Sequence, residues 1–557
     1  MHFTIKRGIV LTTLFTVVTP LLVLNWAKPG IAQEQQQSQQ NNIVVVSNQQ
    51  LELISKARSI TDIAFQYAAA QRSASALKVL DQALALTEKI EVDCYKATPL
   101  MQVANGYILA GEEAKGQKLL TRAFQIAREQ TLALCTSGTL PQESLLSRAK
   151  GYAAEGYDNF VLSIIDGVDN FTRPMQMAEI AGIYWQNKQP EKAREIIRRA
   201  IEIAQSQRLP EFITRRHMLM SIGFPLSEGG YPELLPPVIK QIQESFNSQD
   251  KASLENDLSI RVIQTLSLSK MLVATGEKAQ AIALLNQVLP EIQALPAANS
   301  TSKILNLTQF ATQYTAAGQP EQAKTLLMNA QTAAESLPSM DRDRASAMIA
   351  RAYTEIGQVK MAEDWARRIT SVDEREQVLG AIALEYAKTG NLSQAITIAR
   401  SLTTVNELAL GTTTNEMERT TKKEGTLNNI VAYLLKTKRY DQALELAKQE
   451  KIYNTPQMAM ALADAGKPAQ ALQIAESLTA EEISRQSMCK NCVISAIAQS
   501  FAKQGQLEQA LQLAQQIQSS RDLMMIAAQY IKIDRIANQN KATEILDQAW
   551  KLALSNS

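Results

Sequence analysis

Residues 311–330 read ATQYTAAGQPEQAKTLLMNA, and the spacing in this stretch decides the fold. Ala311 and Tyr314 lie three residues apart and therefore share one face of a helix. Gly318 follows where that helix must stop, because glycine tolerates a left-handed backbone. Pro320 then suits the first turn of the next helix, where its missing N–H costs nothing. The stretch predicts two antiparallel helices joined by a tight turn.

The second helix of this unit carries a stripe of small and apolar residues. Ala323, Leu327 and Ala330 are spaced by four and then three residues, which places all three on one helix face. A single hairpin cannot bury such a stripe by itself. We therefore expect neighbouring hairpins to stack and cover it.

The same pattern recurs along the chain, in about thirteen units. Three further full copies run through Ala350, Tyr353, Gly357 and Ala362; Ala383, Tyr386, Gly390 and Ala395; and Ala498, Phe501, Gly505 and Ala510. Weaker copies centre on Ala64, Ala104, Ala149, Ala181, Ala281, Ala443, Ala471 and Ala542. The poorest copy lies at 223–242, where four prolines interrupt the helical pattern.

Composition agrees with a helical array. Hydrophobic residues make up 45% of the 557 residues but aromatic residues only 5%, which suits closely packed helices better than β-sandwiches. Lys plus Arg (57) nearly balances Asp plus Glu (55), so no surplus of positive charge attracts phosphate backbones. The charge balance argues against nucleic acid as a partner.

This pattern resembles the tetratricopeptide repeat family, whose signature is the small residue, the Tyr, the turn Gly and two later Ala positions. The resemblance runs from about residue 51 to the C-terminus and implies an all-α solenoid of about thirteen helix-turn-helix repeats. Two features depart from the family: the early Trp is absent, and the usual period of about 34 residues is kept irregularly. Ala395 to Ala443 is longer than this period, and Ala443 to Ala471 is shorter.

The N-terminus carries an export signal. Lys6 and Arg7 precede an apolar run over 9–24, and Gly30 and Ala32 provide the small residues of a cleavage site. We predict that residues 1–32 are a signal peptide removed before Gln33. The alternative is an uncleaved anchor helix, although the run is short for a membrane span.

The rest of the chain divides at two polar segments. Residues 33–50, which contain QEQQQSQQNN, are too polar to bury a core and predict a flexible leader. Repeats are expected over 51–410 and again over 426–557. Between them, residues 411–425 (GTTTNEMERTTKKEG) lack an apolar stripe and predict a solvated loop. The loop either divides the array into two parts that flex or interrupts a continuous array, and the sequence favours the second because the pattern resumes at Leu427.

Four cysteines behind an export signal suggest disulfides. Cys94 and Cys135 are separated by roughly one repeat, so both fall near connections on the same edge of the stack and are candidate partners. Cys489 and Cys492 have the spacing of a redox dithiol, but no β-α-β context surrounds them. A local structural disulfide is favoured, with a redox protein as the alternative.

Catalytic and metal-binding motifs find no candidates. After residue 32, His217 is the sole histidine, and neither cysteine pair has a second pair at zinc spacing. The chain contains no His-Glu-x-x-His, no Gly-x-Ser-x-Gly and no phosphate-binding Gly loop. We predict no catalytic residue, no metal and no cofactor, and interpret His217 as a surface or packing residue.

The family resemblance implies where a partner would bind. In this family the outward side of each first helix lines a concave groove. The corresponding positions here are Phe65, Asn105, Ile108, Trp185, Arg351 and Lys388, together with Thr312 and Thr315. Members that clamp a peptide carboxylate use clustered Lys, Arg and Asn on consecutive repeats. Only Asn105 suggests this mode, so we do not predict it.

These features together predict a non-enzymatic scaffold that is exported to the periplasm or cell envelope, or secreted. It would hold a protein or peptide segment in its groove, and the oligomeric state stays open. The alternative is an envelope enzyme, or an accessory to one, that cradles a glycan. A convergence of three or more acidic and aromatic side chains would favour the glycan alternative. No apolar run after residue 32 resembles a membrane span.

Overall fold

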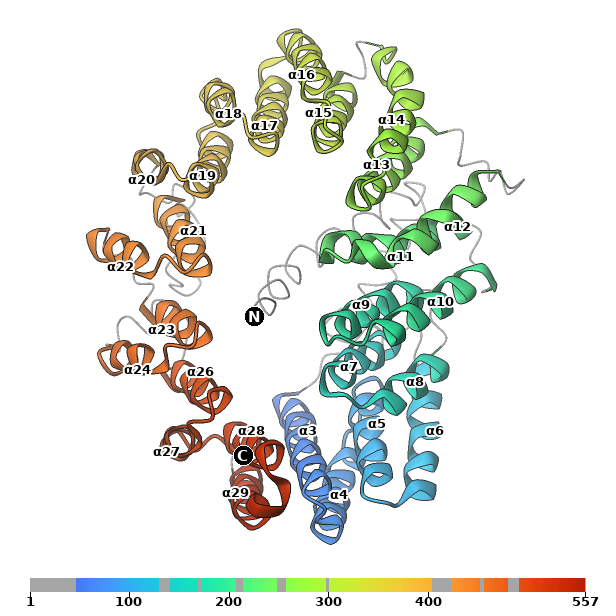
Figure 1. Cartoon of the computed structure of the whole chain (residues 1–557), viewed down its shortest axis with the longest axis vertical. Helices are drawn as coiled ribbons and strands as arrows, with labels where there is room; N and C mark the ends of the chain where they lie inside the picture. The colour runs from blue at the N-terminus through green and yellow to red at the C-terminus, as the bar shows by residue number, and fades with distance from the viewer. Residues whose placement is uncertain are drawn as a thin grey trace. The chain divides into compact units, whose positions relative to one another are not determined.

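The computed structural model describes residues 47–129, 141–168, 172–206, 214–247, 257–296, 300–402, 422–450, 455–478 and 490–555. Within these ranges the regular structure is helical throughout, with 26 α-helices and one short 3₁₀ helix (Figure 1). The predicted all-α solenoid of helical hairpins is confirmed, and the described α-helices follow one another as thirteen successive pairs.

The helices have the following bounds. The N-terminal group is α3 (Asn48–Ala69), α4 (Ser73–Glu88), α5 (Asp93–Leu109), α6 (Glu113–Glu129), α7 (Pro141–Glu155), α8 (Asp158–Gly167), α9 (Arg173–Gln186), α10 (Pro190–Ser206), α11 (Arg215–Gly229), η1 (Pro232–Leu234) and α12 (Pro236–Asn247). The middle group is α13 (Leu258–Ala274), α14 (Lys278–Gln293), α15 (Ser300–Ala316), α16 (Pro320–Glu335), α17 (Ser339–Glu355), α18 (Val359–Ala366), α19 (Val372–Lys388) and α20 (Leu392–Ser401). The C-terminal group is α21 (Lys422–Lys436), α22 (Tyr440–Gln449), α23 (Thr455–Asp464), α24 (Pro468–Glu476), α26 (Lys490–Lys503), α27 (Leu507–Gln516), α28 (Ser520–Ile533) and α29 (Arg535–Ser555).

The hairpin of α15 and α16 forms as its spacing predicts. Ala311 and Tyr314 of α15 are buried, and so is the stripe of Ala323, Leu327 and Ala330 on α16. The turn between the helices contains Gly318, whose φ is +89°. The Gln319 N–H then donates a hydrogen bond of 2.8 Å to the Tyr314 carbonyl in the last turn of α15. The two helices pack on each other, and the hairpin leaves one face for its neighbour to cover.

The turn between first and second helix has a left-handed residue in most hairpins. Among the described hairpins, this residue is glycine in nine and Gln71, Lys188 or Lys438 in three others. Glycine adopts this backbone without the clash that a Cβ atom brings, whereas the three polar residues adopt it at a cost. The turn geometry therefore persists even where the glycine signal is missing from the sequence.

The repeat tyrosines join each hairpin to the one before it. In six described pairs with good hydrogen-bond geometry, the hydroxyl of a tyrosine on a first helix bonds a polar side chain on a second helix. Five of these pairs link consecutive hairpins, and the two residues are 22 to 28 positions apart. The five pairs are Tyr107 with Asp81, Tyr314 with Asn286, Tyr353 with Gln331, Tyr386 with Glu363 and Tyr530 with Glu508. The sixth, Tyr67, is described below.

The proline-rich unit at 223–242 keeps its helices. Pro225 is buried inside α11, which continues to Gly229, while Pro232 and Pro236 begin η1 and α12, where a helix needs no N–H donor. The ring of Tyr231 fills the space beside Gly182 and Gly229, where a Cβ atom would overlap it. This repeat therefore keeps both of its helices despite the prolines.

Two boundaries differ from those expected. α3 begins at Asn48, inside the predicted leader, because the Ser47 side chain accepts a hydrogen bond from the Gln50 N–H and caps the helix. α21 begins at Lys422, inside the predicted loop 411–425, because its first residues are good helix formers. The remainder of that loop and the predicted signal peptide lie outside the described residues.

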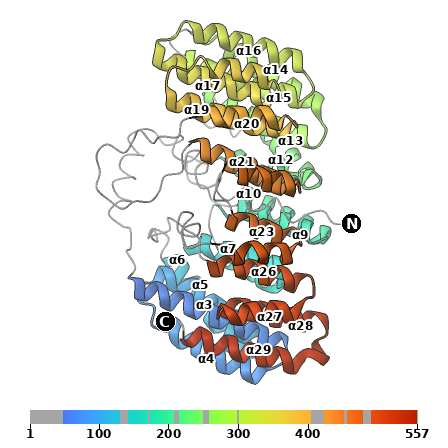
Figure 2. The same cartoon turned by 90° about the vertical axis from the view of Figure 1, so that its left-hand side faces the viewer.

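The chain divides into two compact units. Unit 1 contains Met1–Gln241, Gly466–Leu472 and Asn491–Ser557, and unit 2 contains Ile242–Ala465 and Gln473–Lys490. Unit 1 thus includes both ends of the described chain, and within it α3 packs on α28 and α29 (Figure 2). Among the described helices, none combines the length and apolar character needed to cross a membrane.

Candidate functional site

Three neighbouring first helices of unit 1 bring polar and aromatic side chains together. α3 packs on α5, and α5 packs on α7. We call the group that they form the Asn105 cluster, and its members are Asp62 and Phe65 on α3, Gln102 and Asn105 on α5, and Arg148 and Tyr152 on α7. None of these residues stands at a hairpin turn, so the cluster depends on how the repeats stack.

Aromatic rings form one side of the Asn105 cluster. The rings of Phe65 and Tyr152 are stacked with their centroids 6.1 Å apart. The rings of Tyr157 and Phe160 each form a T-shaped pair with the Phe65 ring, with centroids 5.5 and 6.1 Å from it. Phe65, Tyr152 and Phe160 are buried, whereas Tyr157 is partly exposed. These contacts hold Tyr152 rigidly and fix the position of its hydroxyl.

Arg148 links the charged groups on the other side. Its Nη2 lies 3.3 Å from Oδ1 of Asp62, and its Nη1 lies 3.7 Å from Oε1 of Glu155. The same guanidinium lies over the Tyr152 ring, 4.7 Å from the centroid. The Arg148 guanidinium therefore interacts with two carboxylates and one aromatic face, and these three interactions together fix its position.

Burial raises the pKa values of three ionisable side chains in and beside the Asn105 cluster. It raises the pKa of Asp62, although the positive charges of Arg148, Arg58 and Arg521 oppose the shift. It likewise raises the pKa of Glu155, against the charge of Arg148, and raises the pKa of Tyr152 to about 12. Perturbed groups of this kind gather at functional sites more often than elsewhere, although structural ion pairs produce them too.

Several buried polar atoms of the cluster have no hydrogen-bond partner among the described residues. They are both amide atoms of Asn105, Oε1 of Gln102, Nε of Arg148 and the Tyr152 hydroxyl. Asn105 lies beside this hydroxyl, but the two groups do not form a well-aligned bond. Asn105 is fully buried, and leaving such a group unpaired costs about 1–3 kcal/mol. Such a group in a native protein requires an explanation, for which a bound water, an ion and a functional role are the usual choices.

The predicted groove residues have different environments in the structure. Phe65 and Asn105 are buried and meet around Tyr152, whereas Ile108 and Trp185 are half-buried. Arg351 and Lys388 are exposed. Lys388 pairs with Glu385 at 3.0 Å, and both residues belong to unit 2. The structure brings together only the first two of the six.

His217 has a structural position. It lies in the first turn of α11, where its Nδ1 accepts a hydrogen bond from the Thr214 N–H and its own N–H donates to the Thr214 hydroxyl. This reciprocal pair is a capping box. Burial, with the nearby positive charge of Arg216, lowers the pKa of His217 to about 4.

The cysteine pairings stay predictions. Cys94 lies in the first turn of α5 and Cys492 in the first turn of α26. Cys135 and Cys489 lie outside the described residues. Within the described part of the chain, no group of three or more His, Cys, Asp or Glu side chains could hold a metal ion.

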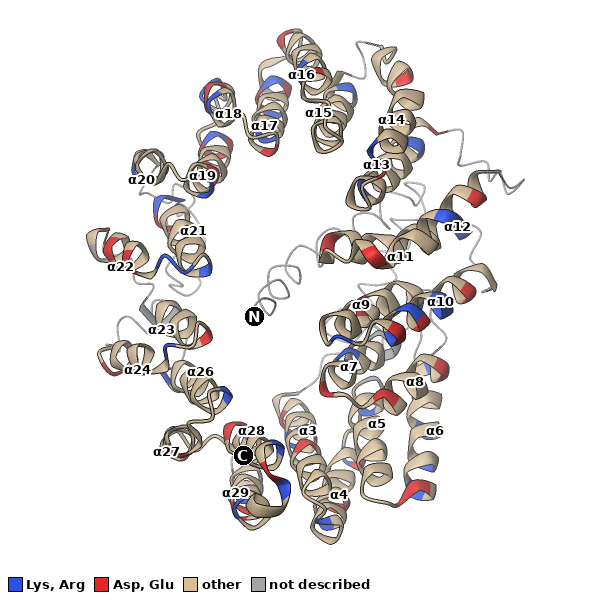
Figure 3. Cartoon of the chain, in the orientation of Figure 1, with Lys and Arg blue, Asp and Glu red and all other residues tan. Residues whose placement is uncertain are grey.

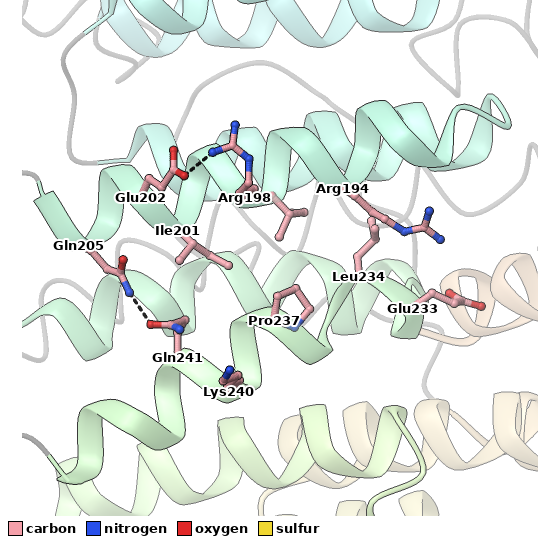
Figure 4. A pocket seen from close by; sticks show the side chains of 11 residues that line it. Arg194, Arg198, Ile201, Glu202, Gln205, Glu233, Leu234, Pro237, Lys240 and Gln241 are labelled. Atoms are coloured by element: carbon pink, nitrogen blue, oxygen red, sulfur yellow. Dashed lines mark hydrogen bonds and ion pairs between the residues drawn. The ribbon is translucent and has the colours of Figure 1, made fainter.

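A cavity of about 520 Å³ lies between α10 and the segment of η1 and α12 (Figure 4). Its apolar lining comes from Ile197, Ile201, Leu234 and Pro237. Charged residues of both signs surround this lining: Arg194, Arg198, Glu202, Glu233 and Lys240. Arg198 already pairs with Glu195 and Glu202, and Arg194 with Glu191. The cavity could accept an apolar side chain, but its rim selects no particular charge.

Both signs of charge are spread over the described helices of the two units (Figure 3). Residues 177–207, which span most of α9 and all of α10, match the family model described as Tetratricopeptide repeat. One helical hairpin of the chain therefore matches the tetratricopeptide repeat, and the other described helices form hairpins in the same succession. No curated protein sequence matches it.

Three solved structures show what this chain is similar to. Ton1535 from Thermococcus onnurineus NA1 is 15% identical, with 63% of this chain and 94% of that chain covered and a TM-score of 0.20. The pentatricopeptide repeat protein PPR10 from maize is 12% identical, with 88% and 73% covered and a TM-score of 0.29. The APC/C hetero-tetramer Cut9-Hcn1 is 12% identical, with 86% and 83% covered and a TM-score of 0.19.

Sequence reasoning missed most of the Asn105 cluster. Gln102 and Asn105 are three residues apart and so share a helix face, which was an available signal. Arg148 and Tyr152 are four residues apart and so also share a helix face, which was a second available signal. Neither pair indicates that α5 and α7 meet around the same point. The tetratricopeptide-like pattern identifies Tyr152 only as a core residue.

Proposed function

We propose that this protein is a non-enzymatic scaffold that holds a segment of a partner protein on the first helices of unit 1, at the Asn105 cluster. The observation that carries the proposal is the buried Asn105 amide, which has neither a donor nor an acceptor partner among the described residues. Tetratricopeptide-like repeats generally serve as protein-interaction scaffolds.

The chemistry of the cluster suits a peptide backbone. An extended peptide presents N–H donors and C=O acceptors, and a side-chain amide can serve one of each. Gln102 offers an unpaired oxygen beside Asn105, and Tyr152 offers a hydroxyl. Because Asn105 and Tyr152 are fully buried in the free chain, the first helices must move apart for a peptide to reach them.

We further propose that the scaffold works in the periplasm or cell envelope. The basic residues, apolar run and small residues within 1–32 support this location. Disulfides between Cys94 and Cys135, and between Cys489 and Cys492, would accord with it. Fractionation followed by N-terminal sequencing and non-reducing peptide mapping tests the location, and a cytoplasmic chain that keeps its N-terminus would refute it.

The substitution Asn105→Leu separates a binding role from a structural one. Leucine has the same branched arrangement of side-chain heavy atoms and no polar atoms, so we expect the midpoint of urea unfolding to rise, with a gain of about 1 kcal/mol. We expect the affinity for peptides selected from a random phage-displayed library on the wild-type chain to fall at least about tenfold, or 1.4 kcal/mol. Titration calorimetry and urea unfolding measure the two effects.

The matched control is Gln125→Leu, which changes an exposed amide on α6 that bonds Glu129 at 2.8 Å. This control should leave peptide affinity unchanged. Selected peptides that bind Asn105→Leu as tightly as the wild type would remove the cluster from the proposal. A drop in stability would instead show that the amide supports the fold.

One observation favours a glycan-binding accessory as a second candidate. Asp62 and Glu155 converge with Phe65, Tyr152 and Tyr157, which is the combination of acids and aromatic rings expected of a carbohydrate site. Against it, both carboxylates face Arg148, and two of the rings are buried. A glycan array probed with wild type and Tyr157→Ala decides, because a carbohydrate signal lost in that variant would favour this candidate.

A further inference from the structure

The first and last hairpins of the chain contact each other in the manner of neighbouring repeats. The Tyr67 hydroxyl on α3 donates a hydrogen bond to Asp547 on α29, across 480 positions of sequence. In five other described pairs a hydrogen bond likewise joins a repeat tyrosine hydroxyl to the second helix of the hairpin before it, with the tyrosine donating in four pairs and Tyr353 accepting in the fifth. The last hairpin therefore occupies the place of a hairpin preceding α3, within unit 1 (Figures 1 and 2).

Further bonds follow the same junction. The Trp550 indole N–H donates to Oε1 of Gln82 at 3.1 Å, and Arg72 donates to Oδ1 of Asn540 at 2.9 Å. The Gln539 amide donates to the Ala70 carbonyl at 2.7 Å. We call these contacts, together with the bond from Tyr67 to Asp547, the end junction.

Apolar burial accompanies these bonds. Ile545, Leu546 and Ala549 on α29 are buried, as are Tyr67 and Ala70 at the end of α3. An open stack of helical hairpins exposes an apolar face at each end unless a polar capping helix covers it. Here both α28 and α29 pack on α3, so the first and last described hairpins cover each other.

The two faces of the end junction are different surfaces. The N-terminal face is built from α3 and α4, and the C-terminal face from α28 and α29. A face of one kind pairs only with a face of the other kind, which makes the contact heterologous. In one chain the two faces are tethered, so the intramolecular contact has a large effective concentration in its favour.

We propose that the end junction is a protein-protein interface whose second partner is another copy of this chain. When the intramolecular junction is released, the N-terminal face of one copy binds the C-terminal face of another. The residues that carry this pairing are Tyr67, Arg72 and Gln82 on one face and Asp547, Asn540 and Trp550 on the other. The intact chain stays monomeric because its own ends occupy each other.

Two matched variants of the full chain test this pairing. The first carries Tyr67→Phe, Arg72→Ala and Gln82→Ala, and the second carries Asp547→Ala, Asn540→Ala and Trp550→Ala. Each removes the same three contacts from opposite sides, so each variant alone has a damaged junction both within the chain and between copies. In a mixture, the intact C-terminal face of the first variant can bind the intact N-terminal face of the second.

We expect the mixture, and neither variant alone, to form a species of twice the 61.4 kDa chain mass in light scattering over a dilution series. The species stops at two chains because its remaining faces are both damaged. Hydrogen exchange in α3 and α29 should rise together in each variant, while circular dichroism and the melting temperature of the other helices stay at wild-type values.

Two results would overturn the proposal. A mixture that remains at monomer mass at every concentration shows that the faces do not pair between copies. Unchanged exchange in α3 and α29 of both variants shows that these side chains do not hold the ends together. The substitution Tyr314→Phe, which removes a like bond within unit 2, serves as the control and should leave exchange in α3 and α29 unaltered.

Discussion

His217 shows how one side chain can couple the stability of a repeat to pH. In the native chain its neutral ring accepts a hydrogen bond from the Thr214 N–H and holds the start of α11. Burial and Arg216 lower its pKa from 6.5 to about 4. Between these two values the unfolded chain binds the proton and the native chain does not, so the stability from this residue is complete above pH 6.5 and declines as the pH falls toward 4.

We expect His217→Gln to flatten that decline. The wild type should lose stability in α11 by up to about 1.4 kcal/mol per pH unit across this range through His217, and the variant should lack that contribution. Hydrogen exchange of the α11 amides at pH 7, 5.5 and 4.5 measures the difference. Equal slopes in the two proteins would mean that the histidine titrates normally in the native state.

Asp343 illustrates a residue whose sequence context misleads. The run from Asp341 to Arg344 alternates charge and indicates a solvated first turn. In the structure Asp343 is buried and accepts bonds from the Thr370 and Ser371 N–H groups, at 2.9 and 2.8 Å, and from the Thr370 hydroxyl. These bonds lower its pKa although burial opposes them. The partners lie in the next hairpin, and no local pattern indicates them.

At the scale of the element, the hairpin turn is the feature that sequence predicts best. Gly318 has φ of +89°, and Lys438 occupies the corresponding turn between α21 and α22 at +64°. Gly318→Ala should destabilise unit 2 by about 1–2 kcal/mol, because a Cβ atom clashes in the left-handed region. Lys438→Gly should stabilise it by up to about 1 kcal/mol, since it removes such a clash. Urea unfolding followed by circular dichroism measures both.

Gly425→Ala is the matched control for these turns. Gly425 lies inside α21 with open space around the position of a Cβ atom. Alanine favours a helix there, so this change should stabilise by about 0.5–1 kcal/mol. If Gly318→Ala proved equally stabilising, the left-handed turn would not be a source of strain.

At the scale of the whole molecule, unit 1 combines repeats from opposite ends of the sequence. Ile545 on α29 is buried near the end junction, and Ile398 on α20 is buried in unit 2. Each Ile→Ala change should cost about 2–5 kcal/mol. We expect Ile545→Ala to raise hydrogen exchange in α3 as well as α29, whereas Ile398→Ala should leave α3 unchanged.

This comparison tests whether the two ends of the chain unfold together. In an open solenoid, stability passes only between sequence neighbours, so damage to α29 would stay in the C-terminal repeats. Exchange that rises in α29 alone after Ile545→Ala would show that α3 folds independently of the last hairpin. Mass spectrometry of peptic fragments from α3, α20 and α29 provides the readout.

Sequence reasoning succeeded where the determinants are local. The spacing of small residue, Tyr, Gly and Ala lies within a single hairpin, so it predicted the helices, their turns and the tetratricopeptide-like fold. It failed at Pro225, which lies inside α11 although its pattern predicts an interrupted helix, because tertiary packing overrides the local preference of one residue. It also selected Phe65 and Asn105 as candidate groove residues from repeat spacing, although it did not associate them with Arg148.

By itself the sequence determined a series of hairpins with buried stripes, because helix periodicity and turn chemistry act over a few residues. Only the tertiary structure decided which side chains meet between hairpins. The unpaired amide of Asn105 depends on three helices packing around one point, and the bond from Tyr67 to Asp547 joins residues 480 positions apart. Contacts at such separations arise from stacking, which no short stretch of sequence specifies.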